Sequence, residues 1–145
     1  MKLLFLGTGT STGIPQIGCE CEVCLSANPK NKRLRTSLLV SIDGKNILID
    51  CGPDFRQQML TNNIKHLDAV LLTHHHYDHI SGLDELRSFT NSKAMPICAE
   101  EYVEDAIKRT FLSNTLSEAL QAAMLSSVSA IPYLSIDAPP AHTSV

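Results

Sequence analysis

Residues 69–79 read AVLLTHHHYDH, an apolar run that passes directly into four histidines and one aspartate within six residues. The apolar run predicts a short buried strand. Ligands of open α/β sheets bind at the carboxyl ends of strands, which is where the histidines begin. Imidazole and carboxylate groups together suit zinc, iron or manganese. The stretch therefore predicts a metal site at the edge of a sheet.

The spacing within this run indicates more than one metal position. His74 and His76 are two residues apart, so their side chains point the same way in an extended segment, and His75 is expected to point away. Asp78 and His79 are adjacent and can face a neighbouring point if the chain turns there. One segment can thus serve two ions about 3.5–4 Å apart, the separation of hydrolytic two-metal sites. The alternative is a solvated histidine-rich loop that binds nickel adventitiously.

The pattern His-x-His-x-Asp-His after an apolar strand resembles the metal signature of the metallo-β-lactamase superfamily. Two further stretches extend the resemblance. Residues 5–10, FLGTGT, are similar to the opening strand and loop of the ribonuclease Z-like branch. Residues 48–52, LIDCG, are similar to the strand whose terminal aspartate supports the metal ligands. The likeness covers residues 1–110 and is strongest to the branch that includes phosphoribosyl cyclic phosphate phosphodiesterase.

The resemblance implies an α/β fold, the amino-terminal part of a four-layer αββα sandwich with metals at one edge. It assigns His74 and His76 to a first metal position, and Asp78 and His79 to a second. Asp50 would hold a ligating imidazole by its other nitrogen; from the residues alone it could equally be a turn residue before Gly-Pro. Two catalytic zinc ions are implied, with Mn²⁺ or iron as alternatives. The implied activity is hydrolysis of a small phosphodiester by a metal-activated hydroxide, which Asp78 would orient as the catalytic residue.

A second candidate metal site is the cluster Cys19-x-Cys21-x-x-Cys24. Three thiolates so close together can share one structural zinc ion, which then takes a fourth ligand. The alternatives are an oxidised pair plus one free thiol, or a redox-active CxxC pair. The resembling phosphodiesterases carry a similar segment, and their fourth ligand is a distant histidine near the carboxyl end. Cys51 and Cys98 are predicted to be small core residues.

Composition excludes several classes of function. The chain has 145 residues, 43% of them apolar, which suits a single folded domain. A net charge of −3 and an aromatic content of 5% argue against a nucleic-acid partner. No apolar run is long enough to span a bilayer and no secretory signal is visible, so a cytoplasmic location without membrane contact is expected. The four cations between Lys30 and Arg35 could steer a phosphate ester or form a solvated loop.

The chain also departs from the superfamily pattern. The fold commonly needs roughly 200 residues or more, and its second half supplies another histidine, a bridging aspartate and a last histidine. Here the only histidine after position 79 is His142, the candidate for a late metal ligand. Residues 1–145 are therefore expected to form one incomplete domain, with 1–110 family-like and 111–145 a divergent tail. The alternative to a hydrolase is a non-catalytic zinc-binding remnant that needs a second copy, a partner chain or the missing half.

Periodicity and turn residues predict the remaining elements. Strands are expected over residues 2–6 (buried), 36–42, 46–50, 68–73 and 96–99, with a hairpin turn at 43–45. A short helix is expected after Pro53, with Phe55, Met59 and Leu60 as its apolar stripe. Apolar residues at positions 80, 83, 86 and 89 predict a helix over 80–89. Further helices are expected over 100–112 and 116–128.

Overall fold

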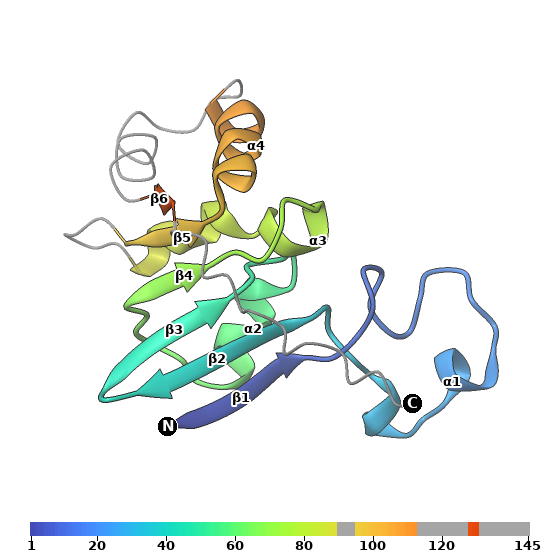
Figure 1. Cartoon of the computed structure of the whole chain (residues 1–145). Helices are drawn as coiled ribbons and strands as arrows, with labels where there is room; N and C mark the ends of the chain where they lie inside the picture. The colour runs from blue at the N-terminus through green and yellow to red at the C-terminus, as the bar shows by residue number, and fades with distance from the viewer. Residues whose placement is uncertain (90–94, 113–127, 131–145) are drawn as a thin grey trace, which may run out of the picture.

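The computed structural model describes residues 1–89, 95–112 and 128–130. In this part of the chain one six-stranded sheet has the strand order β1-β2-β3-β4-β5-β6 (Figure 1). The pairs β1–β2 and β2–β3 are antiparallel, and all later pairs are parallel. The α/β fold class is thereby confirmed. Because β1 and β3 both run opposite to β2, the carboxyl ends of β1, β3, β4 and β5 lie at one edge. The strands are β1 (Lys2–Gly7), β2 (Ser37–Ile42), β3 (Lys45–Ile49), β4 (Ala69–Leu71), β5 (Ile97–Ala99) and β6 (Val128–Ala130).

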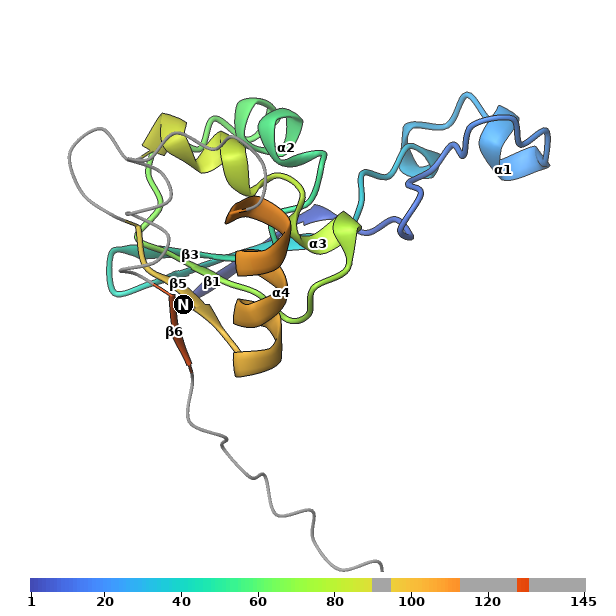
Figure 2. The same cartoon turned by 90° about the horizontal axis from the view of Figure 1, so that it is seen from above.

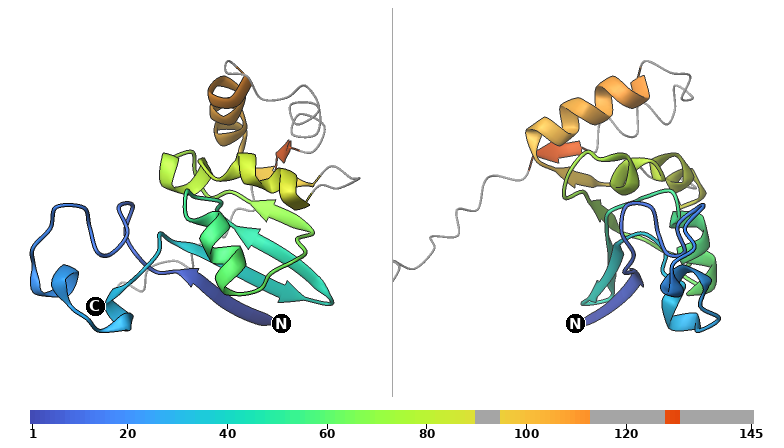
Figure 3. Two further views of the ribbon diagram at one scale, coloured as in Figure 1. Left: turned by 180° about the vertical axis from the view of Figure 1, so that it is seen from behind. Right: turned by 90° about the vertical axis from the view of Figure 1, so that its right-hand side faces the viewer.

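Helices cover one face of this sheet. Seen from behind, α2 and η2 lie in front of the strands (Figure 3), and from above the same pair lies on one side of them (Figure 2). The rings of Phe55 and Phe89 meet edge to face at 5.7 Å and join these two helices. Helix α4 lies toward the β5–β6 end of the sheet (Figure 1). The helices are α1 (Glu22–Leu25), η1 (Pro29–Asn31), α2 (Phe55–Thr61), α3 (Tyr77–Ile80), η2 (Leu83–Phe89) and α4 (Glu101–Leu112).

Strands β2 and β3 form the predicted hairpin. Its loop residues Asp43 and Gly44 have φ angles of 50° and 77°, as a type I′ turn between two strands requires. Asp68 then ties the start of β4 to this hairpin. One carboxylate oxygen accepts from Lys45 Nζ at 2.9 Å and the other from the Asn46 backbone N–H at 2.8 Å. The hydrogen bond from Lys45 is the main reason that the pKa of Asp68 is lowered to about 2.

The helix predicted over residues 80–89 is divided in the structure, where residues 77–89 form two short helices. Helix α3 ends at Ile80, and the 3₁₀-helix η2 begins at Leu83. A 3₁₀-helix has three residues per turn, so residues three apart share one face. Ile80, Leu83 and Leu86 are accordingly buried, and Phe89 packs against the same core. The apolar spacing identified the buried face correctly, but a strict period of three favours the 3₁₀ form.

The sheet face opposite α2 carries exposed apolar side chains. On the edge strand β1, Leu3 is 53% exposed and Phe5 is 66% exposed. Their register partners, Val40 and Leu38, continue the same face onto β2 and are half-buried. The prediction that β1 is buried was therefore wrong for its first four residues, while Leu6 lies in the core. An apolar strip of this kind on an edge strand favours contact with other polypeptide.

Three smaller expectations have different outcomes. Leu60 was expected in the apolar stripe of α2, but it is 60% exposed, and the stripe is formed by Phe55 and Met59. The helix predicted over 116–128 lies outside the described residues except for Val128, which begins β6 instead. In the described ranges no helix combines the length and the apolar character that crossing a bilayer would require.

Candidate metal centre

Asp50 connects the ends of two neighbouring strands. It directly follows β3 with a φ of 63°, a left-handed conformation that Asp tolerates better than most residues. Its backbone N–H donates to the Leu71 carbonyl at 2.9 Å, which fixes the residue beside the end of β4. The carboxylate is only 4% exposed. A buried carboxylate needs hydrogen-bond donors, and the histidine run supplies them.

The Asp50 carboxylate accepts hydrogen bonds from both ends of that run. The Thr73 backbone N–H donates to Oδ1 at 2.8 Å, and His79 Nδ1 lies 2.8 Å from Oδ2. A carboxylate can only accept, so Nδ1 carries the ring hydrogen and the neutral ring has its lone pair on Nε2. That second nitrogen lies 3.2 Å from Asp78 Oδ2. His79 thus presents the nitrogen that carries its lone pair on the side where Asp78 lies.

Thr73 sets the tautomer of His74 in a similar way, a role that the sequence did not predict. The Thr73 hydroxyl is 2.8 Å from Asp50 Oδ2 and 3.0 Å from His74 Nδ1. The hydroxyl has one hydrogen, which the carboxylate takes, so His74 Nδ1 must donate to the hydroxyl oxygen. His74 therefore also has its lone pair on Nε2. The available signal was a hydroxyl residue between the strand and the first histidine.

Three of the predicted ligand rings lie together. The His74 ring centroid is 4.6 Å from that of His76 and 4.0 Å from that of His79. Burial, followed by the charges of these two neighbours, lowers the pKa of His74, which favours the neutral imidazole that a metal needs. His75 instead packs against Tyr102, with ring centroids 5.8 Å apart. Its ring also lies 5.6 Å from that of His76, so His75 borders the group of three rings and contacts Tyr102 on α4 as well.

The backbone around Asp50 is held close to α3. The Cys51 N–H donates to the His79 carbonyl at 2.8 Å, and the Gly82 N–H donates to the Cys51 carbonyl at 2.9 Å. A Cβ on Gly52 would collide with the Asp78 carbonyl oxygen, so only glycine fits. Cys51 is fully buried, as predicted, and burial raises the pKa of its thiol. Cys98, also predicted as a core residue, is only half-buried in β5.

The chemistry of these donor groups fits a metal site. Neutral imidazoles and a carboxylate suit zinc, and Asp50 supplies the outer hydrogen bonds that metal-ligating histidines commonly make. Within the described ranges, however, only the cysteine cluster has three or more ligand atoms that all lie within 4.8 Å of one another. The donors of the histidine run are thus spread more widely than the three thiols. His142, the candidate late ligand, lies outside the described residues.

The cysteine cluster is the more compact group. The sulfur atoms of Cys19, Cys21 and Cys24 all lie within 4.8 Å of one another, and all three thiols are free. The Gln16 backbone N–H points at the Cys24 sulfur at 3.4 Å. A backbone hydrogen bond from Cys24 is the main reason that the pKa of Cys21 is lowered to about 7. The donors at Cys21 favour its thiolate, the form that binds zinc. The pKa of Cys24 is instead raised, because the lowering effect of the Gln16 N–H is outweighed by its hydrogen bond with Cys19, by burial and by its hydrogen bond with Cys21.

A comparison with family models decides the relationship of this chain. The model described as the beta-lactamase superfamily domain matches residues 45–141, about two thirds of the sequence. The chain belongs to the metallo-β-lactamase superfamily. The match includes Asp50 and the whole histidine run. The structure shows the sheet and helix layer of that fold, and the resemblance found in the sequence is confirmed.

Curated relatives of this metallo-β-lactamase-like chain match over part of their length. It is 54% identical over 109 residues to an octanoyltransferase of Porphyromonas gingivalis, a match that covers 74% of this chain and 22% of that protein. It is 37% identical over 101 residues to coenzyme PQQ synthesis protein B of Methylobacterium radiotolerans, which covers 60% and 34% respectively. The chain thus spans about a third or less of the length of these relatives.

Solved structures also match this chain over about half of their own length or less. A diphosphatase of the PhnP family is 41% identical with a TM-score of 0.75, over 89% of this chain and 49% of that one. Zinc-bound PqqB from Methylobacterium extorquens is 26% identical with a TM-score of 0.69, over 90% and 45%. The short form of human tRNase Z is 26% identical with a TM-score of 0.53, over 80% and 42%. The fold is therefore shared with hydrolases and with a protein that binds zinc.

Proposed function

We propose that this chain carries the metal-binding residues of a metal-dependent phosphodiesterase. The observation that supports the proposal most directly is the position of His79 between two carboxylates. Asp50 holds Nδ1 at 2.8 Å and Asp78 lies 3.2 Å from Nε2. Such an arrangement fixes a histidine for ligation. The phosphorus substrate class is supported by the similar diphosphatase of the PhnP family.

Each residue has a distinct role in this proposal. His74 and His76 would hold one ion, and Asp78 and His79 the other, with zinc as the preferred metal and Mn²⁺ or iron as alternatives. Bound there, the ions would supply Lewis acidity toward a phosphoryl oxygen and toward water. Asp78 is 21% exposed and is the open carboxylate of the site, so it orients the attacking water and accepts its proton. Asp50 is too buried to meet substrate and acts through His79.

A double substitution tests the ligand assignment. His74→Ala combined with His76→Ala is expected to abolish the zinc that binds outside the cysteine cluster, measured by metal analysis after dialysis. His75→Ala is the matched control, because it removes an imidazole that contacts Tyr102 and is not assigned as a ligand, so the zinc content is expected to stay unchanged. Equal zinc content in the double variant and in the unmodified chain would reject the assignment.

Ligand counting also predicts how active the chain is by itself. Open two-metal sites commonly need about three protein ligands per ion, and the run of residues 74–79 supplies two each. We therefore expect slow hydrolysis of bis(p-nitrophenyl) phosphate by this chain, and faster hydrolysis when the remaining length of a PhnP-family relative is fused to it. The expectation would be contradicted if the chain alone turned over substrate as fast as a full-length relative does, and if Asp78→Ala abolished that turnover.

The cysteine cluster is proposed to hold a separate structural zinc ion. If it does, Cys19, Cys21 and Cys24 should react slowly with a thiol reagent in zinc-loaded protein and rapidly after chelation. Cys51 should stay unreactive in both states because it is buried. Rapid modification of all three thiols in zinc-loaded protein would show that no closed site exists.

A second candidate function follows from the exposed apolar face. Leu3 and Phe5 on β1 are solvent-exposed, and monomeric proteins rarely leave such strips uncovered. The chain could then be a non-catalytic zinc-binding unit that works only with another polypeptide or a second copy. Sedimentation analysis separates the two candidates, because a catalytically silent chain that forms a defined complex supports the second.

A further inference from the structure

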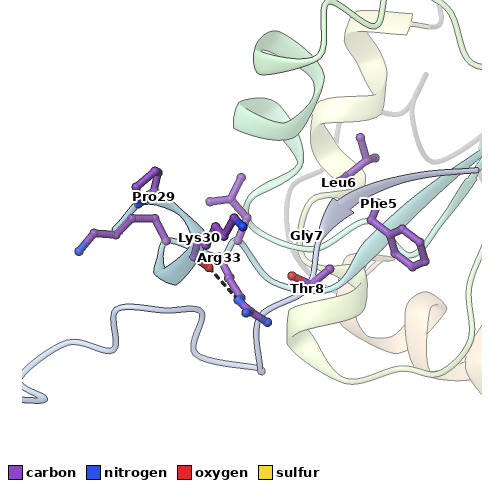
Figure 4. Close-up of a pocket in the computed structure, with 9 residues that line it drawn as sticks. Phe5, Leu6, Gly7, Thr8, Pro29, Lys30 and Arg33 are labelled. Carbon is purple, nitrogen blue, oxygen red and sulfur yellow. Dashed lines mark hydrogen bonds between the residues drawn. The ribbon is translucent and has the colours of Figure 1, made fainter. Parts of the chain in front are cut away.

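A pocket of about 470 Å³ lies at the carboxyl end of β1, outside the histidine run. Residues 5–8 form one wall, and residues 29, 30 and 32–34, in and after η1, form the other (Figure 4). The volume is within the range of small-molecule sites. Nothing in the hydrolytic proposal uses this pocket, so its chemistry can be considered independently.

The charge of the pocket is positive. Lys30, Lys32 and Arg33 line it, and none of its lining residues is acidic. The neighbouring Arg35 is different, because its guanidinium pairs with Asp54 at 2.9 Å. Among the described residues no carboxylate lies within ion-pair distance of the three lining cations. The chain as a whole has a net charge of −3, so this concentration of positive charge is local and favours an anionic ligand.

The cations are held on an ordered backbone. Asn28 Oδ1 accepts from the Lys30 backbone N–H at 3.0 Å and caps η1. Arg33 pairs with Ile14 through two backbone hydrogen bonds of 2.7 and 2.8 Å. Arg33 Nε also donates to the Lys30 carbonyl at 3.0 Å, the dashed line in Figure 4. Because Nε is engaged, the terminal nitrogens of the guanidinium remain available for a forked contact with phosphate oxygens.

The other wall adds an apolar ring. Phe5 lines the pocket and is 66% exposed, so its face is available to a ligand. Thr8 lines the same wall and is exposed, so its hydroxyl can donate to an anion. In Figure 4 the guanidinium of Arg33 lies between Lys30 and Thr8, while Phe5 lies on the opposite side of Thr8. A ligand that contacts both the cations and the Phe5 ring carries a phosphate at one end and a flat ring at the other.

We propose that this pocket binds organic phosphates in which the phosphate is attached to an aromatic group. Lys30 and Arg33 hold the phosphate, and the ring packs against Phe5. None of its lining residues is a proposed metal ligand, since none belongs to the histidine run or to the cysteine cluster. Binding at this pocket and hydrolysis at the histidine run can therefore fail separately.

The test measures binding of phenyl phosphate by titration calorimetry in a phosphate-free buffer, with the zinc-loaded variant that combines His74→Ala and His76→Ala, so that the cysteine cluster keeps its zinc. Phenyl phosphate should bind, inorganic phosphate should bind several-fold more weakly, and phenol should not bind measurably. Arg33→Gln and Lys30→Gln should each lower the affinity for phenyl phosphate roughly tenfold, as expected for loss of a charge-assisted hydrogen bond. Lys65→Gln, an exposed cation far from the pocket residues in sequence, is the matched control and should change nothing.

Two further results decide the location and the role of the ring. Phe5→Leu should reduce the affinity for phenyl phosphate to that for inorganic phosphate without changing the latter. In amide spectra, phenyl phosphate should shift the signals of Thr8 and Arg33 and leave His79 unaffected. The proposal is overturned if phenol binds as well as phenyl phosphate, if Arg33→Gln has no effect, or if the shifts concentrate in the histidine run.

Discussion

Replacing Asp50 with asparagine should disable the metal centre while preserving its shape. Asparagine has one acceptor oxygen where aspartate has two, and the structure uses both oxygens of Asp50. If the amide oxygen still accepts the hydrogen bond from the Thr73 backbone N–H, the amide NH₂ faces His79 Nδ1. That nitrogen must then accept, so the ring hydrogen moves to Nε2, the atom that would bind metal. The substitution changes the tautomer of a ligand without removing it.

The magnitude follows from the role of such outer partners. Loss of a hydrogen-bonding group behind a ligating histidine typically costs 10- to 100-fold in metal affinity, about 1.4–2.7 kcal/mol. We therefore expect Asp50→Asn to raise the zinc dissociation constant of the histidine run by that factor, measured by competition with a chromophoric chelator. The cysteine cluster should be alkylated beforehand so that it contributes no zinc binding.

A matched control separates this effect from general loss of stability. Asp54 lies four residues further along, is 18% exposed and pairs with Arg35 at 2.9 Å, so Asp54→Asn also breaks a carboxylate interaction. The Asp54→Asn variant should have a lower free energy of unfolding and an unchanged zinc affinity. Thr73→Val should weaken zinc binding less than Asp50→Asn does, because it removes the hydroxyl between Asp50 and His74 but leaves the carboxylate that holds His79. Thr73→Ser should restore the affinity. Unchanged zinc affinity in Asp50→Asn would refute the tautomer argument.

Three further outcomes can be measured. Gly52→Ala should lower the free energy of unfolding by about 1–3 kcal/mol in urea titrations, because its Cβ would overlap the Asp78 carbonyl; a neutral effect would mean that the backbone there is not closely packed. Asp68→Asn should destabilise the fold at pH 7, since the neutral amide carries no charge to pair with Lys45. The difference from the unmodified chain should disappear as the pH falls from about 4 to about 2, where Asp68 itself becomes protonated. A difference that persists at pH 2 would exclude charge as its cause. Leu3→Thr should reduce binding of an apolar fluorescent dye and change the free energy of unfolding by less than about 0.5 kcal/mol, because this side chain is 53% exposed; a large loss of stability would show that the strand is covered.

The parts of the fold that could be predicted depend on local chemistry. Asp43-Gly44 specifies a hairpin because both residues adopt positive φ at low cost. The position of the histidine run could also be predicted, because an apolar run that ends in histidines places them at the end of a strand. In both cases the determining contacts lie within a few residues of the signal. No knowledge of distant parts of the chain is needed.

The parts that could not be predicted depend on partners distant in sequence or on small energy differences. Whether β1 is buried is decided by what covers the opposite face of the sheet, and Leu3 and Phe5 carry no information about that. The choice between an α-helix and a 3₁₀-helix for residues 83–89 rests on one hydrogen bond per turn, and the same apolar face serves both. The Thr73 contact was missed because it requires Asp50, which lies 23 residues earlier and meets it only when β3 and β4 pair.

The same pairing explains why the centre can form before any ion binds. Asp50 and Thr73 end two adjacent parallel strands, so the strand register alone brings the carboxylate to the first histidine. The backbone hydrogen bonds of Cys51 then bring His79 back to the same carboxylate. Two imidazoles are thus oriented by one buried acid, using only contacts between residues 50–52 and 71–82. Pre-orientation reduces the entropy that ligands lose on binding, but it adds no ligand atoms. Metal affinity should therefore be limited by the number of donors, and added ligands from another segment should raise it without changing how His74 and His79 are held.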